Sequence, residues 1–416
     1  MAWWRSHPSL AAVVSDILYA ELSRLRPGSA LPARPWPELL AIGEAGLGCD
    51  SLEKLSLAAA LGRALRLDRS GLEDHLLART TLGSWIELAA LCLSREDGSL
   101  VFSTSGSTGE PKYCEHPLEL LEQEVDFLAG LFADRRRIVS VVSSRHIYGF
   151  LFSVLLPARL GVPVHRRLDR STVGLGADLL AGDLLIGFPD FWRLAGRSVD
   201  HFPAGVEGVT STAPLPRDIP GVLTTLGLGR LVEIYGSSET AGIGWRPASE
   251  ENFTLFPYWS RSSETLVRRL PGGNESLYAP PDRLDWTTPR QFSAQGRLDD
   301  AVQVGGHNVH PARIAALLES HPAVAAASVR LMRPDEGDRM KAFIVPSEPC
   351  ADTARLAEIL ARWADESLTP AERPKSFRFG SALPRNPIGK AADWEIRDGT
   401  HDRLGEDGQN AALRSV

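Results

Sequence analysis

The sequence predicts an α/β chain with a helical N-terminal region, a mixed α/β core and a small α+β domain near the C-terminal end. Three observations support this fold class. The first 95 residues show helical spacing of apolar residues and no strand pattern. Between residues 100 and 240, short apolar runs at 100–102, 138–142 and 184–186 alternate with helical segments. Residues 301–347 alternate between strand and helix patterns again.

Composition narrows the class of protein. The chain has 416 residues, which suggests two or three domains, and a formal net charge of −7, which gives no basic field for nucleic acid. Cys49, Cys92, Cys114 and Cys350 are scattered without paired or metal-ligand spacing, so we expect reduced thiols and a cytoplasmic location. The N-terminus lacks the pattern of a signal peptide, and we expect no membrane span.

Four segments follow from these patterns. Residues 1–96 form the helical region, with helices expected at 8–25, 51–65, 72–78 and 82–93. The core covers residues 97–298, the small C-terminal domain covers 299–398, and residues 399–416 are a polar tail. Within the small domain we expect strands at 301–304, 325–331 and 341–345 and a helix at 311–319.

A Ser/Thr/Gly loop directly follows the strand at 100–102. Residues 103–112 read STSGSTGEPK. Glycines let the backbone approach a phosphate, hydroxyl and N–H groups donate to its oxygens, and a lysine adds a point charge. The complete pattern resembles the phosphate loop of the adenylate-forming superfamily, which includes acyl-CoA synthetases and aryl-CoA ligases. The resemblance assigns ATP contacts to Ser103, Thr104, Ser105, Gly106, Ser107, Thr108, Gly109 and Lys112.

Further motifs of this superfamily follow in the same order. Residues 235–240, YGSSET, resemble the segment whose tyrosine stacks on adenine and whose glutamate holds Mg²⁺. The corresponding nucleotide residues are Ser211, Thr212, Ala213, Tyr235, Gly236, Ser237 and Ser238, with Glu239 as the metal ligand. Thr212 stands where glycine is common in the family.

The C-terminal motifs concern the ribose, the hinge and the second half-reaction. Arg297 resembles the nucleotide-binding arginine, and Asp299 the hinge about which the small domain turns. The ribose-binding aspartate lies fifteen residues before that arginine in the family, which gives Asp282, with Asp285 in reserve. Two further sites follow from the resemblance: Gly305, Gly306 and His307 for the thiol path, and Lys390 for catalysis of adenylation.

The resemblance implies an ATP-dependent ligase. A carboxylate attacks the α-phosphate of ATP, and a thiol then displaces AMP from the acyl-AMP. Charge gathers at phosphorus and on the leaving pyrophosphate, so the chemistry needs positioned cations. The expected cofactors are ATP, Mg²⁺ and either CoA or phosphopantetheine, and the expected catalytic residues are Lys390, Lys112 and His146.

The acid is expected to be aromatic. Residues 145–150, RHIYGF, lack the aspartate that holds an amino acid's ammonium group, and resemble the corresponding segment of 4-coumarate–CoA ligases. The resemblance places His146 beside the carboxylate and Tyr148 at the pocket floor, while Gly242 and Gly244 would leave space for a flat ring. His146 as an ordinary core histidine and a medium-chain fatty acid as substrate remain alternatives.

The N-terminal region offers a second possible thiol. Residues 48–52, GCDSL, and the helix order around them resemble an acyl carrier protein, which would make Ser51 a phosphopantetheine attachment site. A phosphopantetheinyl transferase would then be a partner. The thiol acceptor is therefore expected to be CoA, a separate carrier protein or residues 8–94 of the same chain. The alternative is that these helices only cap the adenylation core and that Ser51 is a plain helix N-cap. A non-catalytic adenylation-fold scaffold is the rival from another functional class.

Overall fold

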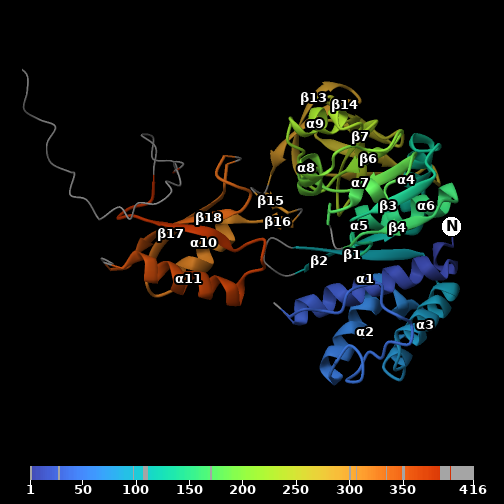
Figure 1. Cartoon of the computed structure of the whole chain (residues 1–416), viewed down its shortest axis with the longest axis horizontal. Helices are drawn as coiled ribbons and strands as arrows, with labels where there is room; N and C mark the ends of the chain where they lie inside the picture. Colours follow the sequence, from blue (N-terminus) through green and yellow to red (C-terminus); the bar gives the residue numbers. More distant parts are fainter. Residues whose placement is uncertain are drawn as a thin grey trace, which may run out of the picture. The chain divides into compact units, whose positions relative to one another are not determined.

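The computed structural model describes residues 2–26, 29–96, 98–105, 111–168, 171–298, 301–305, 307–333, 335–348, 352–384 and 394. They form two compact units, the larger with the described residues up to 298 and the smaller with those from 301 onward (Figure 1). Each unit has a hydrophobic core of its own.

The first 95 residues form helices close to the predicted positions. Their bounds are η1 Trp3–Arg5, α1 His7–Leu25, α2 Ser51–Leu65, η2 Leu67–Ser70, η3 Glu73–Leu76 and α3 Leu82–Arg95. Helix α2 begins at the predicted residue because the Asp50 carboxylate accepts from the Glu53 amide and the Glu53 carboxylate accepts from the Asp50 amide. The N-cap is therefore Asp50, and the expectation of an N-cap at Ser51 is wrong. The same reciprocal arrangement of Thr81 and Ser84 begins α3.

A nine-stranded sheet forms the centre of the larger unit. The strand order is β13-β14-β9-β8-β7-β6-β5-β3-β4, parallel from β4 to β7 and antiparallel from β7 to β13. The bounds are β3 Arg137–Ser140, β4 Val164–Arg166, β5 Asp183–Ile186, β6 Glu207–Thr210, β7 Arg230–Ser237, β8 Ala241–Pro247, β9 Phe253–Leu255, β13 Asp282–Thr288 and β14 Gln291–Arg297. The predicted strand at 184–186 is confirmed, and it is fully buried as an interior parallel strand should be.

Two smaller sheets and several helices complete this unit. Strands β1 Ser99–Ser105 and β2 Pro111–Pro117 form an antiparallel hairpin, and β10 Trp259–Ser262, β11 Thr265–Arg269 and β12 Glu275–Tyr278 form a three-stranded sheet. The helices are α4 Leu118–Leu131, α5 Ile147–Phe150, η4 Leu151–Leu155, α6 Leu156–Leu160, α7 Leu175–Asp178, α8 Pro189–Ser198 and α9 Ile219–Thr225. Among the helices that the structure describes, none has the length and apolar character of a membrane span.

The N-terminal helices share one hydrophobic core with the sheet. Helix α1 contacts α2 and α3, and α2 also contacts β1 of the hairpin (Figure 1). Leu57 of α2 and Phe102 of β1 belong to the same buried cluster. The Trp3 and Phe150 rings meet edge-on, with their centroids 5.0 Å apart. The described residues up to 96 therefore pack as part of the larger unit.

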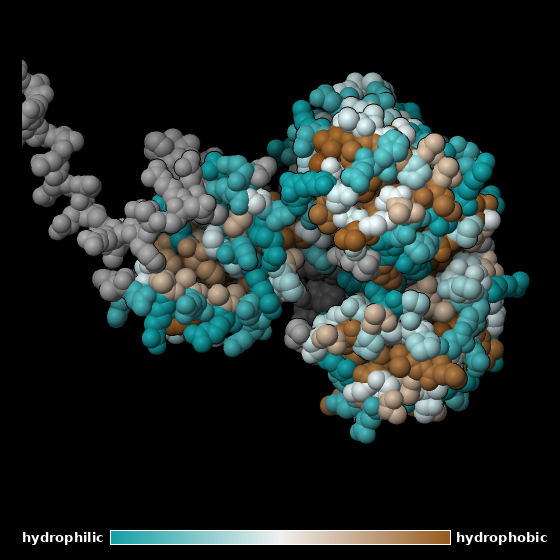
Figure 2. Space-filling model, in the orientation of Figure 1, coloured by the Kyte–Doolittle hydropathy of each residue, from teal (hydrophilic) through white to brown (hydrophobic). Residues whose placement is uncertain are grey.

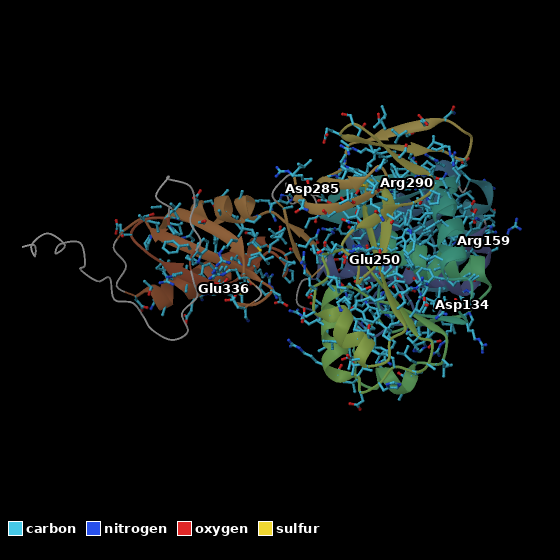
Figure 3. All side chains as sticks on the ribbon, turned by 90° about the horizontal axis from the view of Figure 1, so that it is seen from above. Asp134, Arg159, Glu250, Asp285, Arg290 and Glu336 are labelled. Atoms are coloured by element: carbon cyan, nitrogen blue, oxygen red, sulfur yellow. The ribbon has the colours of Figure 1, made fainter. Side chains whose placement is uncertain are left out.

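The smaller unit is an α+β fold. Its elements are β15 Val302–Val304, β16 His307–Val309, α10 Pro311–Glu319, β17 Val324–Leu331, β18 Met340–Pro346, α11 Thr353–Ser367 and β19 Pro374–Phe379, close to the predicted strands and helix. Glu336, labelled in Figure 3, is nearly buried and pairs with Lys341 and Arg330. Burial alone would favour the neutral acid, but hydrogen bonds from Arg330 and Lys341 hold the pKa of Glu336 far below its ordinary value.

Glu124 of α4 is a buried carboxyl group beneath the β7–β8 connection. Its Oε2 atom accepts a hydrogen bond from the Gly242 amide at 2.8 Å, and its Oε1 atom has no partner within the described part of the chain. Burial raises the pKa of Glu124 to about 7, and this effect outweighs the nearby Arg268 cation and the Gly242 amide. The folded protein therefore holds a proton here that the unfolded chain loses above its ordinary pKa of 4.5.

We predict that Glu124→Gln removes part of the pH dependence of stability. As pH rises from about 4.5 through about 7, the wild type should lose up to about 3 kcal/mol of stability at this site, because the unfolded chain ionises this carboxyl group while the folded state must keep it protonated. Glutamine has no proton to lose. Urea unfolding at pH 5.5 and pH 8 should show a smaller difference for the variant than for the wild type. Glu119→Gln, at an exposed position of the same helix, is the control; an equal pH response in all three proteins would contradict the assignment.

Candidate active site

The carboxyl ends of the parallel strands β5, β6 and β7 lie at one edge of the sheet, where open α/β sheets bind ligands. The predicted residues Ser211, Thr212 and Ala213 follow β6 there, and Tyr235, Gly236 and Ser237 end β7. Ser211 donates its hydroxyl hydrogen to the Ile234 carbonyl oxygen at 2.9 Å. Thr212 has a φ of 80°, a conformation that favours glycine and explains why glycine is common at this family position.

The loop after β7 is tightly held. The Ser237 hydroxyl oxygen accepts from the amides of Glu239 and Thr240, and Ala241 has the left-handed φ of 59°. Three buried side chains, from β11, α4 and β10, form hydrogen bonds with the backbone of Thr240 and Gly242. The contacts are Arg268 to the Thr240 carbonyl at 3.2 Å, Glu124 to the Gly242 amide at 2.8 Å and Trp259 to the Gly242 carbonyl at 2.9 Å.

The β1–β2 hairpin meets this loop at two points. The Lys112 ammonium donates to the Glu239 carboxylate at 2.5 Å. The His116 Nε2 atom lies 2.6 Å from the Ser238 carbonyl oxygen. Partial burial favours the neutral acid at Glu239, but the hydrogen bond from Lys112 lowers its pKa below the ordinary value. The sequence analysis missed His116, because His116 lies outside every motif and the strand β2 that carries it was not predicted.

The phosphate loop is only partly described. Ser103, Thr104 and Ser105 lie on β1, whose last two residues pair with Lys112 and Pro111 across the hairpin. The predicted residues Gly106, Ser107, Thr108 and Gly109 lie outside the described residues, so their assignment stays a prediction.

Tyr235 and Asp282 come together, although they are 47 residues apart. The Tyr235 hydroxyl donates to the Asp282 carboxylate at 2.5 Å, and the tyrosine ring contacts Phe253 and Phe292. Asp285 lies on the same strand, is exposed and is labelled in Figure 3. This contact favours Asp282 over the reserve candidate as the carboxylate beside the predicted adenine site.

Arg297 and the residues beyond it are less completely described. The backbone of Arg297 pairs with that of Asp282 at the end of β14, and Asp299 lies outside the described residues. In the smaller unit, Gly305 turns between β15 and β16 with a φ of 57°, and His307 begins β16. Gly306 and Lys390 also lie outside the described residues.

The predicted acid-binding segment enters α5 at the same edge of the sheet. His146 precedes α5, and its carbonyl oxygen accepts from the Phe150 amide at 2.8 Å. Tyr148 is buried, and its hydroxyl group lies 2.9 Å from the Gly187 carbonyl oxygen and 3.0 Å from that of Val209. The Tyr148 hydroxyl is thus bonded to the protein at the ends of β5 and β6, which leaves its predicted contact with a ring hydroxyl unsupported in this conformation.

The expectation of free space at Gly242 and Gly244 is not met. A Cβ atom at Gly242 would lie 2.3 Å from the Glu124 carboxylate and 2.5 Å from the Phe256 ring. At Gly244 it would lie 2.8 Å from the Thr254 carbonyl oxygen. Glycine is needed at both positions because the protein's own atoms approach closely, so these two residues do not open the space for a ring that the sequence analysis assigned to them.

The residues around Glu239 suit a magnesium ion that binds together with nucleotide phosphates. Within the described part of the chain, no three His, Cys, Asp or Glu side chains gather as a metal site of their own. Mg²⁺ commonly takes one or two carboxylates and fills its remaining positions with phosphate oxygens and water. The single carboxylate of Glu239, opposite the Lys112 ammonium, fits that donor set.

Comparisons with known proteins agree with the family motifs. A model of the AMP-binding enzyme C-terminal domain family matches residues 313–390. The 4-coumarate–CoA ligase of Halorhodospira halophila is 41% identical over 342 residues, which cover 82% of this chain and 87% of that protein. The 4-coumarate–CoA ligase of Rhodobacter capsulatus is 38% identical over 366 residues, which cover 85% and 92% of the two chains.

The N-terminal region takes part in these similarities. The matches to both ligases leave less of the chain uncovered than the 96 residues of the helical region, so part of that region lies within each match. Among solved structures, an amide bond synthetase from Marinactinospora thermotolerans has the same fold, with a TM-score of 0.58, 16% identity and 92% of each chain covered. The chain therefore belongs to the adenylate-forming superfamily, among its AMP-forming acid–CoA ligases.

Proposed function

We propose that this chain activates an aromatic carboxylic acid as its acyl-AMP and transfers the acyl group to the thiol of CoA. The observation that carries the proposal is a pair of hydrogen bonds at the end of β7 and in the loop that follows it. Tyr235 donates to Asp282, and Lys112 donates to Glu239. These pairs supply an aromatic face with a carboxylate for the nucleoside, and a cation with a carboxylate for the phosphates and their metal ion.

In the first half-reaction, a carboxylate oxygen of the acid attacks the α-phosphorus of ATP and the bond to pyrophosphate breaks. Lys112, which donates to Glu239 in this structure, would donate to phosphate oxygens, and Glu239 would be the protein's ligand to the metal ion. Mg²⁺ held there would neutralise charge on the phosphates. Lys390 supplies a second cation between the incoming carboxylate and the phosphate, as the resemblance implies.

In the second half-reaction, the thiol sulfur attacks the acyl carbonyl carbon, AMP leaves with the electron pair of the broken C–O bond, and the thiol proton passes to solvent. Lys390 has no task in this step. The path of the thiol would be lined by Gly305, Gly306 and His307. The smaller unit would rotate about the hinge at Asp299 between the two half-reactions. These roles rest on the family resemblance.

The substrate class rests on two observations. The relatives described above are named 4-coumarate–CoA ligases, and the segment at 145–150 carries no carboxylate for an amino group. A hydroxylated aromatic acid fits best, with His146 beside its carboxylate. A medium-chain fatty acid is the alternative substrate, and a non-catalytic scaffold is the alternative function. The presence of Lys112, Glu239, Arg297 and Lys390 at positions that match the family's motifs argues against the scaffold.

A phosphopantetheine thiol attached to Ser51 is a second candidate for the acceptor. Ser51 is exposed in the first turn of α2, where a helix favours a phosphate, and Leu52 beside it is 75% exposed. Figure 2 shows apolar patches on the part of the surface that Figure 1 draws with α1, α2 and α3. Arg66 and Arg69, just beyond the other end of α2, both bind Glu115 of β2. A helix tied to the hairpin in this way is unsuited to the movement of a carrier domain, so CoA is the better-supported acceptor.

A phosphopantetheinyl transferase is a partner for this second candidate only, and a separate carrier protein stays a third possible acceptor. The cytoplasmic location also stays a prediction. It rests on the cysteines, of which Cys49, Cys92 and Cys114 are unpaired and buried, with the pKa of each thiol raised by burial.

An acid panel with two readouts tests the proposal. We expect pyrophosphate release with ATP, Mg²⁺ and 4-coumarate, formation of the acyl-CoA when CoA is added, and no change in the mass of the protein. Preference for octanoate over 4-coumarate would contradict the aromatic assignment, and no release with any acid would favour the scaffold. Protein co-expressed with a phosphopantetheinyl transferase, beside a control carrier, tests Ser51: a mass gain at Ser51 alone would establish the second acceptor.

We predict that Lys390→Ala separates the two half-reactions. Acid-dependent pyrophosphate exchange should fall by about 10²–10³, because one preorganised cation is worth roughly 3–4 kcal/mol in the transition state. Thioester formation from supplied acyl-AMP should stay within about threefold of the wild type. Lys375→Ala, at an exposed position of β19, is the matched control and should change neither rate. Equal loss of both half-reactions in the Lys390 variant would contradict the assigned role.

A further inference from the structure

Asp16 of α1 is buried far from any predicted motif, yet it binds the chain beside His146. Its side chain is 2% exposed. The Oδ2 atom accepts from the Ser144 amide at 2.6 Å and from the Ser144 hydroxyl at 2.7 Å. Arg166 of β4 donates to the same oxygen at 3.1 Å, and Arg34 donates to Oδ1. One carboxylate therefore satisfies a buried amide, a buried hydroxyl and two guanidinium groups.

Ser144 lies in the turn that leads into the acid-binding segment. The His146 amide donates to the Ser143 carbonyl oxygen at 3.3 Å, which closes the turn two residues after the Asp16 contact. This turn also packs closely on α5, since a Cβ atom at Gly149 would lie only 2.0 Å from the Ser143 oxygen. A displacement of Ser144 is therefore transmitted to His146 and to the start of α5.

The far end of the same segment also rests on the N-terminus. Phe150 ends α5, and its ring meets the Trp3 ring edge-on at 5.0 Å. Trp3 is itself buried. The segment from Ser144 to Phe150 is thus held at both ends by residues from the first sixteen of the chain.

We propose that Asp16 is a positioning residue of the acid site, which fixes the turn at 143–146 so that His146 stands at the carboxylate of the bound acid. The inference rests on the proposed function for its kinetic consequence, but its structural part does not. Through Asp16, helix α1 would then contribute to acid binding by holding this turn in place. Neutralising Asp16 leaves the Ser144 amide with a weaker acceptor and two guanidinium groups without their carboxylate, so the turn should loosen.

Asp183 provides a matched control. It is another buried aspartate, 1% exposed, and it pairs with Arg137 at 2.6 Å and accepts from the Leu180 amide at 2.7 Å. It begins β5, at the end of that strand opposite the acid site. Asp183→Asn therefore breaks a comparable buried pair without touching the turn.

The first measurement is pyrophosphate exchange with 4-coumarate. Asp16→Asn should raise the KM for the acid at least tenfold while the KM for ATP changes less than twofold, and Asp183→Asn should leave both values within twofold. Ser144→Ala, which removes only the hydroxyl contact, should raise the KM for the acid by a smaller factor and serves if Asp16→Asn does not fold. An acid KM that stays within twofold in both the Asp16 and Ser144 variants would overturn the proposal.

Hydrogen exchange separates this inference from the proposed function. In Asp16→Asn, amides in peptides covering 141–152 should exchange at least tenfold faster than in the wild type, and more than in Asp183→Asn. Unchanged exchange there would overturn the positioning role even in an active enzyme. If the wild type adenylates no acid but Asp16→Asn still exchanges faster in these peptides, the proposed function is rejected and the positioning of the turn by Asp16 is kept.

Discussion

The buried guanidinium of Arg268 is the contact on which the geometry of the nucleotide site depends. It is 1% exposed and donates to the carbonyl oxygens of Thr240 and Leu120 and to the side chain of Gln123. It therefore joins β11, α4 and the loop that carries Glu239. A buried cation needs this full set of acceptors, because an unsatisfied one would cost several kcal/mol. The left-handed Ala241 next to Thr240 is kept in place by the same contacts.

Around this anchor, side chains from several elements of the larger unit meet at the predicted nucleotide site. The hairpin brings Lys112 and His116 to the loop, and β13 brings Asp282 to Tyr235. The N-terminal helices bind the hairpin through Glu115 and the acid segment through Asp16. The proposed chemistry assigns Lys390 to the first half-reaction alone, and this role stays a prediction.

Local patterns in the sequence predicted much of this fold. The start of α2 at Ser51 was predicted to the residue from the apolar spacing of residues 51–65, although its cap is Asp50 and not Ser51. The buried strand at 184–186 was predicted from its apolar run. The family spacing singled out Asp282, but its hydrogen bond to Tyr235 was not predicted.

The contacts that complete the site could not be predicted from the sequence. Asp16 and Ser144 are 128 residues apart, and nothing in the amphipathic pattern of α1 marks Asp16 as buried. Glu124 also sits in an ordinary helical pattern. The error at Gly242 has the same origin, because a glycine shows that something approaches closely, but the sequence does not show whether it is a ligand or, as here, the Glu124 carboxylate and the Phe256 ring.

The central claim is that one edge of the sheet holds both the nucleotide and the acid. A crystal structure with a stable 4-coumaroyl-AMP analogue, in which a sulfamoyl group replaces the phosphoryl group, tests it most directly. We predict the adenine against the Tyr235 ring, a ribose hydroxyl donating to Asp282, and the acyl carbonyl beside His146. An analogue bound away from this edge, with its nucleoside remote from Tyr235 and Asp282, would contradict the account.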